Sequence, residues 1–325
     1  MNNQLFKNEE VEIRFFFILV FGLMLMSIFS FILNSRVDRS DNSVPTYIVE
    51  KTFPEINIQA KSAIVFDIRN KRSIFEKNAD SILPIASLAK IMSAITAIDT
   101  LTPKIVEITN DALLSYGDSG LKSGEKWELG DILDFSLLTS SNDGIRAVAL
   151  ALGALNYDKQ SNNSSSVENF VKNMNNKANQ MGIKSLYFTN ETGLDESNFE
   201  AGAYGSARDI STLLTNALID YPQIFEATRE TEIEIVSLAH EPHRAINTNN
   251  MTPEIPGLIA SKTGYTKNAG GNLAFIFDPE IGRPIAVVIL GSTHQGRFED
   301  ARLILRATFD FIKDSEELKY LDSKK

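Results

Sequence analysis

Three short motifs bring together serine hydroxyls and lysine ammonium groups, the residue types on which acyl transfer depends. The first motif is Ser87-x-x-Lys90. Residues three apart on a helix share one face, so the lysine can reach the serine hydroxyl. A serine becomes a good nucleophile when a base takes its proton, and a lysine can be that base if burial or a second cation lowers its pKa. The spacing alone is a weak signal, because Ser119-x-x-Lys122 repeats it.

The second and third motifs add groups that such a serine could use. Ser140-Ser141-Asn142 offers a hydroxyl and a carboxamide two residues apart, which could relay a proton and hold a substrate amide. Taken alone, it is equally an N-cap for the following helix. Lys262-Thr263-Gly264 would supply a second cation, a hydroxyl and a glycine that permits close backbone approach to a ligand. Taken alone, it is equally a surface turn.

The order of the three motifs is more specific than any one of them. S-x-x-K, then S-x-N, then K-T-G resembles the set shared by penicillin-binding proteins and class A β-lactamases, which acylate a serine. Ser87, Ser140 and Lys262 open the three motifs in that order. The sequence therefore predicts an enzyme that forms an acyl-enzyme on Ser87.

Hydrophobic patterning predicts the strands that hold these motifs. Two strands are predicted over residues 63–67 and 73–76, joined by a hairpin turn. A second pair is predicted near the end of the chain, over residues 272–277 and 284–290. Strands at both ends of a helical middle predict an α+β body whose sheet is completed by distant segments.

Helical periodicity covers most of the remaining chain. A helix is predicted to open within Pro84–Met92, the segment that carries the first motif. The other predicted helices span residues 130–152, 167–181 and 302–312. An Asn- and Ser-rich patch, Gln160–Ser166, is predicted to be an exposed loop.

The N-terminal region contains an uncharged apolar run, Phe15–Leu33. A helix of about 19 residues is ~28 Å long, close to the hydrocarbon thickness of a bilayer. The run lacks the small-residue cleavage site of a secretory signal, which favours an uncleaved transmembrane anchor. The predicted organisation is a cytoplasmic tail (1–14), the anchor (15–33), a stalk (34–53), a catalytic domain (54–318) outside the cytoplasmic membrane, and a short tail (319–325).

Composition excludes several classes of protein. Lys plus Arg number 32 against 42 Asp plus Glu, and the net charge of -10 argues against a nucleic-acid binder. The absence of cysteine excludes thiol catalysis, disulfide scaffolds and iron–sulfur clusters. The histidines, His240, His243 and His294, lack the spacing of a zinc enzyme and are predicted to be solvated loop residues. We therefore expect no metal and no cofactor.

The likeness extends beyond the three motifs. From about Ser62 to Ile312 the chain resembles the serine-type D-alanyl-D-alanine carboxypeptidases, the low-molecular-mass penicillin-binding proteins of peptidase family S11. This resemblance implies a β-lactamase/DD-peptidase-like fold, in which a sheet is flanked by helices and an all-helical region is inserted. Segments that resemble family signatures are Phe75–Asp80, Gly124–Trp127, Phe170–Ala178, Asn190–Leu194, Tyr204–Asp209, Asn247–Asn249 and Gly296–Ala301.

The resemblance implies roles for the catalytic residues. Ser87 would be the nucleophile that the carbonyl of the penultimate D-alanine acylates, and Lys90 its general base. Ser140 and Asn142 would assist proton transfer and substrate positioning. Lys262 would supply an electrostatic field.

The resemblance also implies substrate-binding residues. Thr263 would help to bind the terminal carboxylate, and Arg297 would contact it. The oxyanion hole would be formed by the backbone N–H of Ser87 and of Tyr265, which follows Gly264. Arg208 is predicted to be a structural ion-pair residue instead. The implied ligands are peptidoglycan stem peptides and β-lactams.

Two departures leave alternatives open. Ala89 stands where the family usually has threonine, and Glu191 replaces the proline of its N-P-x-G-L segment. Glu191-x-x-Leu194-Asp195 is also similar to the E-x-x-L-N motif of β-lactamases. The predicted function is a penicillin-sensitive serine DD-carboxypeptidase. The alternatives are a β-lactamase, a DD-endopeptidase, and a sensor that is acylated without turnover.

Overall fold

The computed structural model describes residues 52–100, 104–114, 117, 119–154 and 163–322, together with Met24 and Met26; side chains are described for these residues except 163–165 and 314–322. The chain divides into two compact units, 1–50 and 51–325. The predicted tail 1–14 and all but two residues of the predicted membrane segment 15–33 lie outside the described residues. Within the described part, no helix is both long and apolar enough to cross a membrane.

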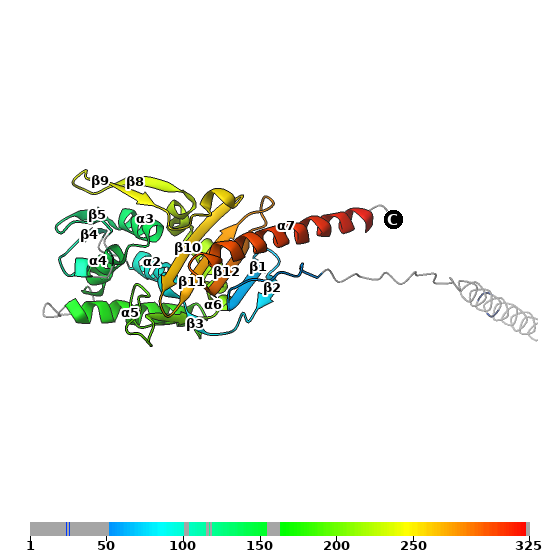
Figure 1. Ribbon diagram of the computed structural model, residues 1–325, viewed down its shortest axis with the longest axis horizontal. Coiled ribbons are helices and arrows are strands. Elements are labelled where there is room, and N and C mark those ends of the chain that lie inside the picture. Colours follow the sequence, from blue (N-terminus) through cyan, green and yellow to red (C-terminus); the bar gives the residue numbers. More distant parts are fainter. Residues whose placement is uncertain are drawn as a thin grey trace, which may run out of the picture. The chain divides into compact units, whose positions relative to one another are not determined.

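A five-stranded sheet forms the backbone of the second unit, and all its neighbouring strands are antiparallel. Its strand order is β10 (Leu258–Thr266), β11 (Gly270–Phe277), β12 (Ile285–Ser292), β1 (Ser62–Asp67) and β2 (Arg72–Lys77). Because β12 pairs with β1, the end of the chain completes a sheet begun at its start. This arrangement confirms the predicted strands and their distant pairing (Figure 1).

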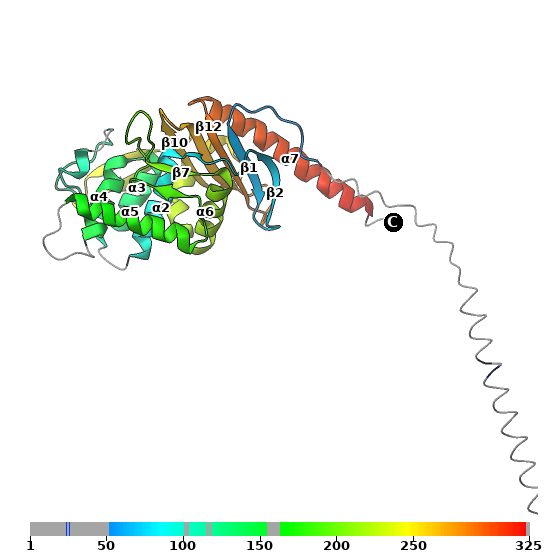
Figure 2. The same ribbon diagram turned by 90° about the horizontal axis from the view of Figure 1, so that it is seen from below.

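The two faces of the sheet support separate hydrophobic cores. On β12, Ile285, Val287 and Ile289 belong to one core, whereas the alternate residues belong to the other. This alternation follows from the two-residue period of a strand. The C-terminal helix α7 (Gly296–Asp322) packs on the first face through residues that include Phe298. Figure 2 shows the sheet between α7 on one side and helices α2 and α6 (Ala207–Asp220) on the other.

A mainly helical region is inserted in the chain between β2 and β10. Its centre is α2 (Ala89–Asp99), whose residues 89–97 are all buried. Around α2 lie α3 (Leu129–Thr139), α4 (Asn142–Gly153) and α5 (Asn163–Gln180). A helix surrounded in this way is apolar on most sides, which explains why α2 carries Ile, Met and Ala rather than an exposed charged stripe.

The inserted region is not all-helical, so that part of the prediction is wrong. It also carries three small sheets and several short 3₁₀ turns, because its connecting segments pair with one another. The strands are β3 (Leu83–Pro84), β4 (Ile105–Glu107), β5 (Lys126–Glu128), β6 (Tyr187–Phe188), β7 (Ala203–Gly205), β8 (Glu232–Val236) and β9 (Pro242–Ile246). The turns are η1 (Ala86–Leu88), η2 (Ala112–Leu114), η4 (Pro222–Phe225), η5 (Ala227–Arg229) and η6 (Thr252–Glu254).

The bounds of three predicted helices differ in the structure, and one of them, α7, spans Gly296–Asp322 instead of 302–312. The helix predicted over 130–152 is divided into α3 and α4, because Ser140 adopts a left-handed conformation with φ of 62°. Ser141 then caps α4, and its hydroxyl accepts a hydrogen bond from Gly144 N at 3.0 Å. Residues 163–166 belong to α5 rather than to the predicted loop, whereas residues 160–162 lie outside the described residues.

Candidate active site

Ser87 lies in η1, the 3₁₀ turn that leads directly into α2. Lys90 follows one turn later, and its Nζ donates a hydrogen bond to Ser87 Oγ at 3.0 Å. Ser87 is half-buried, whereas the Lys90 side chain is fully enclosed, with 0 % exposure. The structure therefore places the two residues of the first motif on one face, as their spacing predicts.

The backbone around Ser87 is enclosed from two sides. Ala86, which precedes it, has a φ of 49°, a conformation that residues other than glycine rarely adopt. On one side lies Gly193, where a Cβ atom would stand 2.0 Å from Ala86 O. On the other lies Gly264 of β10, where a Cβ atom would stand 3.2 Å from Ser87 N. The two glycines allow their segments to hold the strained turn at close range.

Lys90 Nζ has three hydrogen-bond acceptors. Besides Ser87 Oγ, they are Asn142 Oδ1 at 2.8 Å and the carbonyl oxygen of Thr192 at 2.9 Å. Burial lowers the pKa of Lys90 to about 7, against the opposing influence of the negative charge of Glu191. A lysine with this pKa is partly neutral near pH 7, so it can accept a proton from the serine that it contacts.

The segment Asn190–Leu194 provides that carbonyl group. Asn190 Oδ1 accepts hydrogen bonds from Thr192 N at 3.2 Å and from Gly193 N at 2.7 Å, and its Nδ2 donates to Leu194 O at 2.9 Å. One asparagine thus fixes the turn that presents Thr192 O to Lys90. Thr192 was not among the predicted site residues, although the N-x-x-G-L signature contains it.

Ser140 and Lys262 are in direct contact. Lys262 Nζ donates to Ser140 Oγ at 3.0 Å and to Thr263 O at 3.0 Å. Burial lowers the pKa of Lys262 well below its ordinary value, and the charges of Lys90 and Arg297 lower it further. The three motifs, distant in the chain, therefore meet in one buried cluster of hydroxyls and amines.

Thr263 belongs to the K-T-G segment, and Arg297 is bonded to it. Thr263 Oγ1 is 2.6 Å from Thr248 Oγ1, and Arg297 Nη1 donates to Gly264 O at 2.8 Å. Arg297 is only 4 % exposed, and burial lowers its pKa to about 10, so it remains a cation at neutral pH. A buried guanidinium suits a carboxylate ligand.

Tyr265 points away from the buried cluster. Its side chain is exposed, and its ring lies edge-on against His294 with ring centroids 4.6 Å apart. Its backbone belongs to β10, which is an edge strand of the sheet. Gly264 of this strand lies against the backbone of Ile85 and Ser87. An edge strand in this position has backbone groups available to a ligand.

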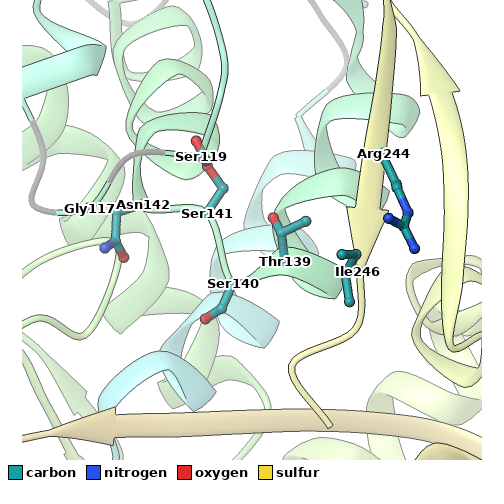
Figure 3. A pocket seen from close by; sticks show the side chains of 8 residues that line it. All are labelled: Gly117, Ser119, Thr139, Ser140, Ser141, Asn142, Arg244 and Ile246. Atoms are coloured by element: carbon teal, nitrogen blue, oxygen red, sulfur yellow. The ribbon is translucent and has the colours of Figure 1, made fainter. Parts of the chain in front are cut away.

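A cavity of about 340 Å³ adjoins the cluster at Ser140 and Asn142 (Figure 3). Arg244 and Ile246, both from β9, stand opposite these two residues. The remaining lining residues are Gly117, Ser119, Thr139 and Ser141. A cavity that combines an arginine, an isoleucine and several hydroxyls can accept part of a peptide next to Ser140 and Asn142.

The prediction of solvated loop histidines is wrong for His243. His243 lies in β9 and is buried, with Nε2 3.1 Å from Glu125 Oε1 and its ring centroid 4.9 Å from that of Trp127. The alternation of β9 turns this residue inward, and the short strand gave too little pattern to reveal it. His240 and His294 are exposed. Among the described residues, no group of three or more acidic or histidine side chains could hold a metal ion.

Arg208 is a structural ion-pair residue, as predicted. It pairs with Glu76 Oε2 at 2.6 Å and with Asp80 Oδ1 at 2.6 Å. These bonds tie the start of α6 to β2 and the loop after it. The two carboxylates raise the pKa of Arg208.

The fold is that of penicillin-binding proteins and DD-peptidases, with an α+β architecture. The chain belongs to peptidase family S11, D-alanyl-D-alanine carboxypeptidase, which it matches over residues 49–293. This membership confirms the family predicted from the motifs.

Two curated relatives and one solved structure illustrate the likeness. The chain is 30% identical to D-alanyl-D-alanine carboxypeptidase DacF of Bacillus subtilis over 76% of its own length, but it spans only 61% of DacF. It is 30% identical to the D-alanyl-D-alanine endopeptidase of Pseudomonas aeruginosa, covering 75% of this chain and 76% of the relative. The cefotaxime-bound structure of penicillin-binding protein D2 from Listeria monocytogenes matches with a TM-score of 0.64 and 23% identity, covering 79% of this chain and 99% of that one.

Proposed function

We propose that the protein is a serine DD-carboxypeptidase that removes the terminal D-alanine from peptidoglycan stem peptides through an acyl-enzyme on Ser87. The observation that carries this proposal is the contact between Ser87 Oγ and the fully buried Lys90 Nζ, whose pKa is lowered to about 7. Family membership and the name of the Bacillus relative support the substrate class.

In the acylation step, Lys90 accepts the Ser87 proton as Oγ attacks the carbonyl carbon of the penultimate D-alanine. The negative charge that develops on the carbonyl oxygen is stabilised by the backbone N–H groups of Ser87 and Tyr265. The close approach of Gly264 to Ser87 N, where a Cβ atom would stand at 3.2 Å, supports this pairing of donors. The tetrahedral intermediate then expels the amino group of the terminal D-alanine.

The leaving amine needs a proton before it departs. Ser140 Oγ contacts Lys262 Nζ, and Asn142 Oδ1 accepts a hydrogen bond from Lys90 Nζ, so both groups of the second motif reach the lysines. We assign proton delivery to Ser140, which gives its proton to the amine and regains the one that Lys90 took from Ser87, so that Lys90 is neutral again; positioning of the substrate and Lys90 is assigned to Asn142. In the second half-reaction, water attacks the ester, Lys90 takes a proton from the water, and Ser87 Oγ recovers one as it leaves.

Thr263 and Arg297 would hold the carboxylate of the terminal D-alanine. The buried guanidinium, fixed by its bond to Gly264 O, supports this assignment. An endopeptidase cuts after the same D-alanine but within a cross-link. The test is to incubate the protein with a monomeric pentapeptide and with a cross-linked dimer of the same peptide. Preferential release of D-alanine from the monomer supports the proposal. Faster cleavage of the dimer would favour endopeptidase activity, the activity for which the Pseudomonas aeruginosa relative is named.

The contacts of the E-x-x-L-N-like segment argue against a β-lactamase. Asp195, which stands at the asparagine position, accepts hydrogen bonds from Thr266 Oγ1 at 2.8 Å and Asn268 N at 3.0 Å. Glu191 pairs with Arg146. Both residues are therefore engaged in holding the segment. We propose that β-lactams acylate Ser87 and leave slowly; rapid hydrolysis of penicillin would contradict this.

We also propose that residues 15–33 anchor the protein in the cytoplasmic membrane, with residues 1–14 inside and the catalytic domain outside. The uncharged run Phe15–Leu33 supports this proposal. Fractionation of cells that express the full chain, or a chain starting at Pro45, tests it. The full chain should remain with the membrane and be digested by protease added to spheroplasts. A full chain found in the soluble fraction, or protected from protease, would contradict this topology.

A further inference from the structure

An ion pair between a buried carboxylate and a half-buried arginine lies close to Lys90, in a place that the mechanism above does not use. Glu191 is 1 % exposed, and its Oε1 is 3.0 Å from Nη1 of Arg146 on α4. Its second oxygen, Oε2, is buried and has no hydrogen-bond partner among the residues that the structure describes. A buried carboxylate with a single cationic partner is poorly screened, so its charge acts on its surroundings.

The pair is attached to the same elements that hold Lys90. Arg146 lies one turn after Asn142 on α4, and Asn142 is an acceptor for Lys90 Nζ. Glu191 directly precedes Thr192, whose carbonyl is another acceptor for Lys90. The backbone of Glu191 is in turn held by the Ser93 hydroxyl, one turn after Lys90 on α2. A change at the Glu191–Arg146 pair therefore alters the electrostatic field at Lys90 and also affects two of the three hydrogen-bond acceptors of Lys90 Nζ.

We propose that Glu191 and Arg146 act together as a positioning pair that sets the pH range in which Lys90 activates Ser87. Glu191 acts through Lys90 and is not the base that activates the deacylating water. This inference rests on the proposed function, since it assumes that Lys90 must be neutral for Ser87 to be acylated. The negative charge of Glu191 raises the pKa of Lys90 against the effect of burial, which gives the direction of the test.

The other charged groups around Lys90 do not provide the same control. Lys262 of β10 is a second amine, and burial, followed by the charges of Lys90 and Arg297, lowers its own pKa well below the ordinary value. Asp143 of α4 accepts a hydrogen bond from Ser119 at 3.1 Å, at the start of the helix. On α5, Lys177 pairs with Asp99, which is the last residue of α2 and lies at the opposite end from Lys90. Among these described groups, Glu191 is the anion that acts on Lys90.

The experiment measures the rate of acylation by a fluorescent penicillin against pH, in the wild type and in Glu191→Gln, Glu191→Asp and the double variant Glu191→Gln/Arg146→Gln. Loss of Glu191 alone leaves the Arg146 cation unpaired, so the acidic limb of the profile should move down by about one pH unit. Loss of both charges should give a smaller downward shift. Glu191→Asp keeps the negative charge, so the acidic limb of its profile should lie closer to the wild-type position than that of Glu191→Gln. The expected order of the limbs, from low to high pH, is the single glutamine variant, the double variant and the wild type.

Glu254→Gln is the matched control, because it removes a glutamate paired with Arg302 between η6 and α7, on the other face of the sheet. It should leave the limb unchanged. Thermal unfolding of each variant checks that it is folded. If Glu191→Gln does not fold, the double variant, which lacks both charges, still allows the test.

A uniformly lower rate of acylation with an unmoved acidic limb would overturn the proposal in favour of a purely structural pair. An unmoved limb with a lengthened acyl-enzyme lifetime would overturn it in favour of a deacylating base. Absence of Ser87-dependent label in the wild type would instead refute the proposed function.

Discussion

Gly193 lies against the carbonyl oxygen of Ala86, so closely that a Cβ atom at Gly193 would stand 2.0 Å from it. This contact joins the segment that presents Thr192 O to Lys90 with the turn that presents Ser87. Since Ala86 itself has a φ of 49°, the turn depends on neighbours that hold it in place. The position of the nucleophile thus depends on a glycine more than a hundred residues away in the chain.

Replacement of Gly193 by alanine should therefore damage both stability and acylation. Gly193 has a φ of +77°, and Gly182 has a φ of +76° but no neighbouring atom within 4 Å of the place that an alanine Cβ would take, which makes Gly182→Ala a matched control. We expect Gly182→Ala to cost about 1 kcal/mol through its backbone conformation alone. Gly193→Ala should cost about 2–4 kcal/mol and slow the labelling of Ser87 by penicillin. Equal losses in urea unfolding and unchanged labelling in both variants would contradict the role given to this contact.

Acylation of Ser87 should depend on pH through Lys90. Because burial lowers the pKa of Lys90 to about 7, the lysine is mainly protonated below pH 6 and mainly neutral above pH 8. The rate of labelling by penicillin should therefore rise about tenfold per pH unit on the acidic side and level off above about pH 7. A rate that rises only above pH 9, as an ordinary lysine would require, would contradict the assignment of Lys90 as general base.

Arg297 should recognise the free carboxylate of the substrate. We expect Arg297→Met to lower kcat/KM for a D-Ala-D-Ala peptide by about 10–150-fold, the range for loss of a hydrogen bond to a charged group. The same variant should have little effect on an analogue that ends in an amide. Arg302→Met, which removes an exposed arginine paired with Glu254, is the control. Equal losses on the acid and the amide would show that Arg297 acts only on the fold.

Asp134 of α3 should make the fold less stable as pH rises. Burial raises the pKa of Asp134 to about 7, and the charges of Asp131 and Glu226 raise it further. Between pH 4 and 7 the folded protein keeps a proton that the unfolded chain releases, so stability falls with increasing pH. Asp134→Asn removes this loss, and after allowance for solvent screening it should add about 1–2 kcal/mol at pH 8 and little at pH 4.

Chemical unfolding of Asp134→Asn and wild type at the two pH values measures this effect. Asp220→Asn, which changes an exposed carboxylate at the end of α6, is the control. A difference between Asp134→Asn and wild type that stays constant from pH 4 to pH 8 would contradict the prediction.

The sequence predicted the reacting groups well because their signals are local. The three-residue spacing of Ser87 and Lys90 needs only a helical turn, and the structure has one. The strands of the sheet were equally visible, because β1, β11 and β12 are runs of apolar residues that bury both faces. The fold and the meeting of the three motifs followed from these elements together with their order in the chain.

The parts that sequence did not reveal depend on long-range contacts. Ser140 ends α3 in a left-handed conformation, which a serine within an apolar helical pattern does not signal. His243 is buried because Glu125 and Trp127, distant in the chain, line its side of β9. The participation of Thr192 rests on a backbone carbonyl, which every residue possesses and no residue type indicates. The pairing of Glu191 with Arg146 likewise appears only once α4 and the 190–194 segment lie together.

The most direct test of the account compares the wild-type protein with Ser87→Ala on a D-Ala-D-Ala peptide and on a fluorescent penicillin. The account predicts that wild type releases D-alanine and carries a penicillin label that lasts for minutes or longer, and that Ser87→Ala does neither. Durable label without release of D-alanine would indicate a sensor, and a short-lived label with hydrolysed penicillin would indicate a β-lactamase. Release of D-alanine by Ser87→Ala at the wild-type rate would contradict the central claim that the reaction proceeds through an acyl-enzyme on Ser87.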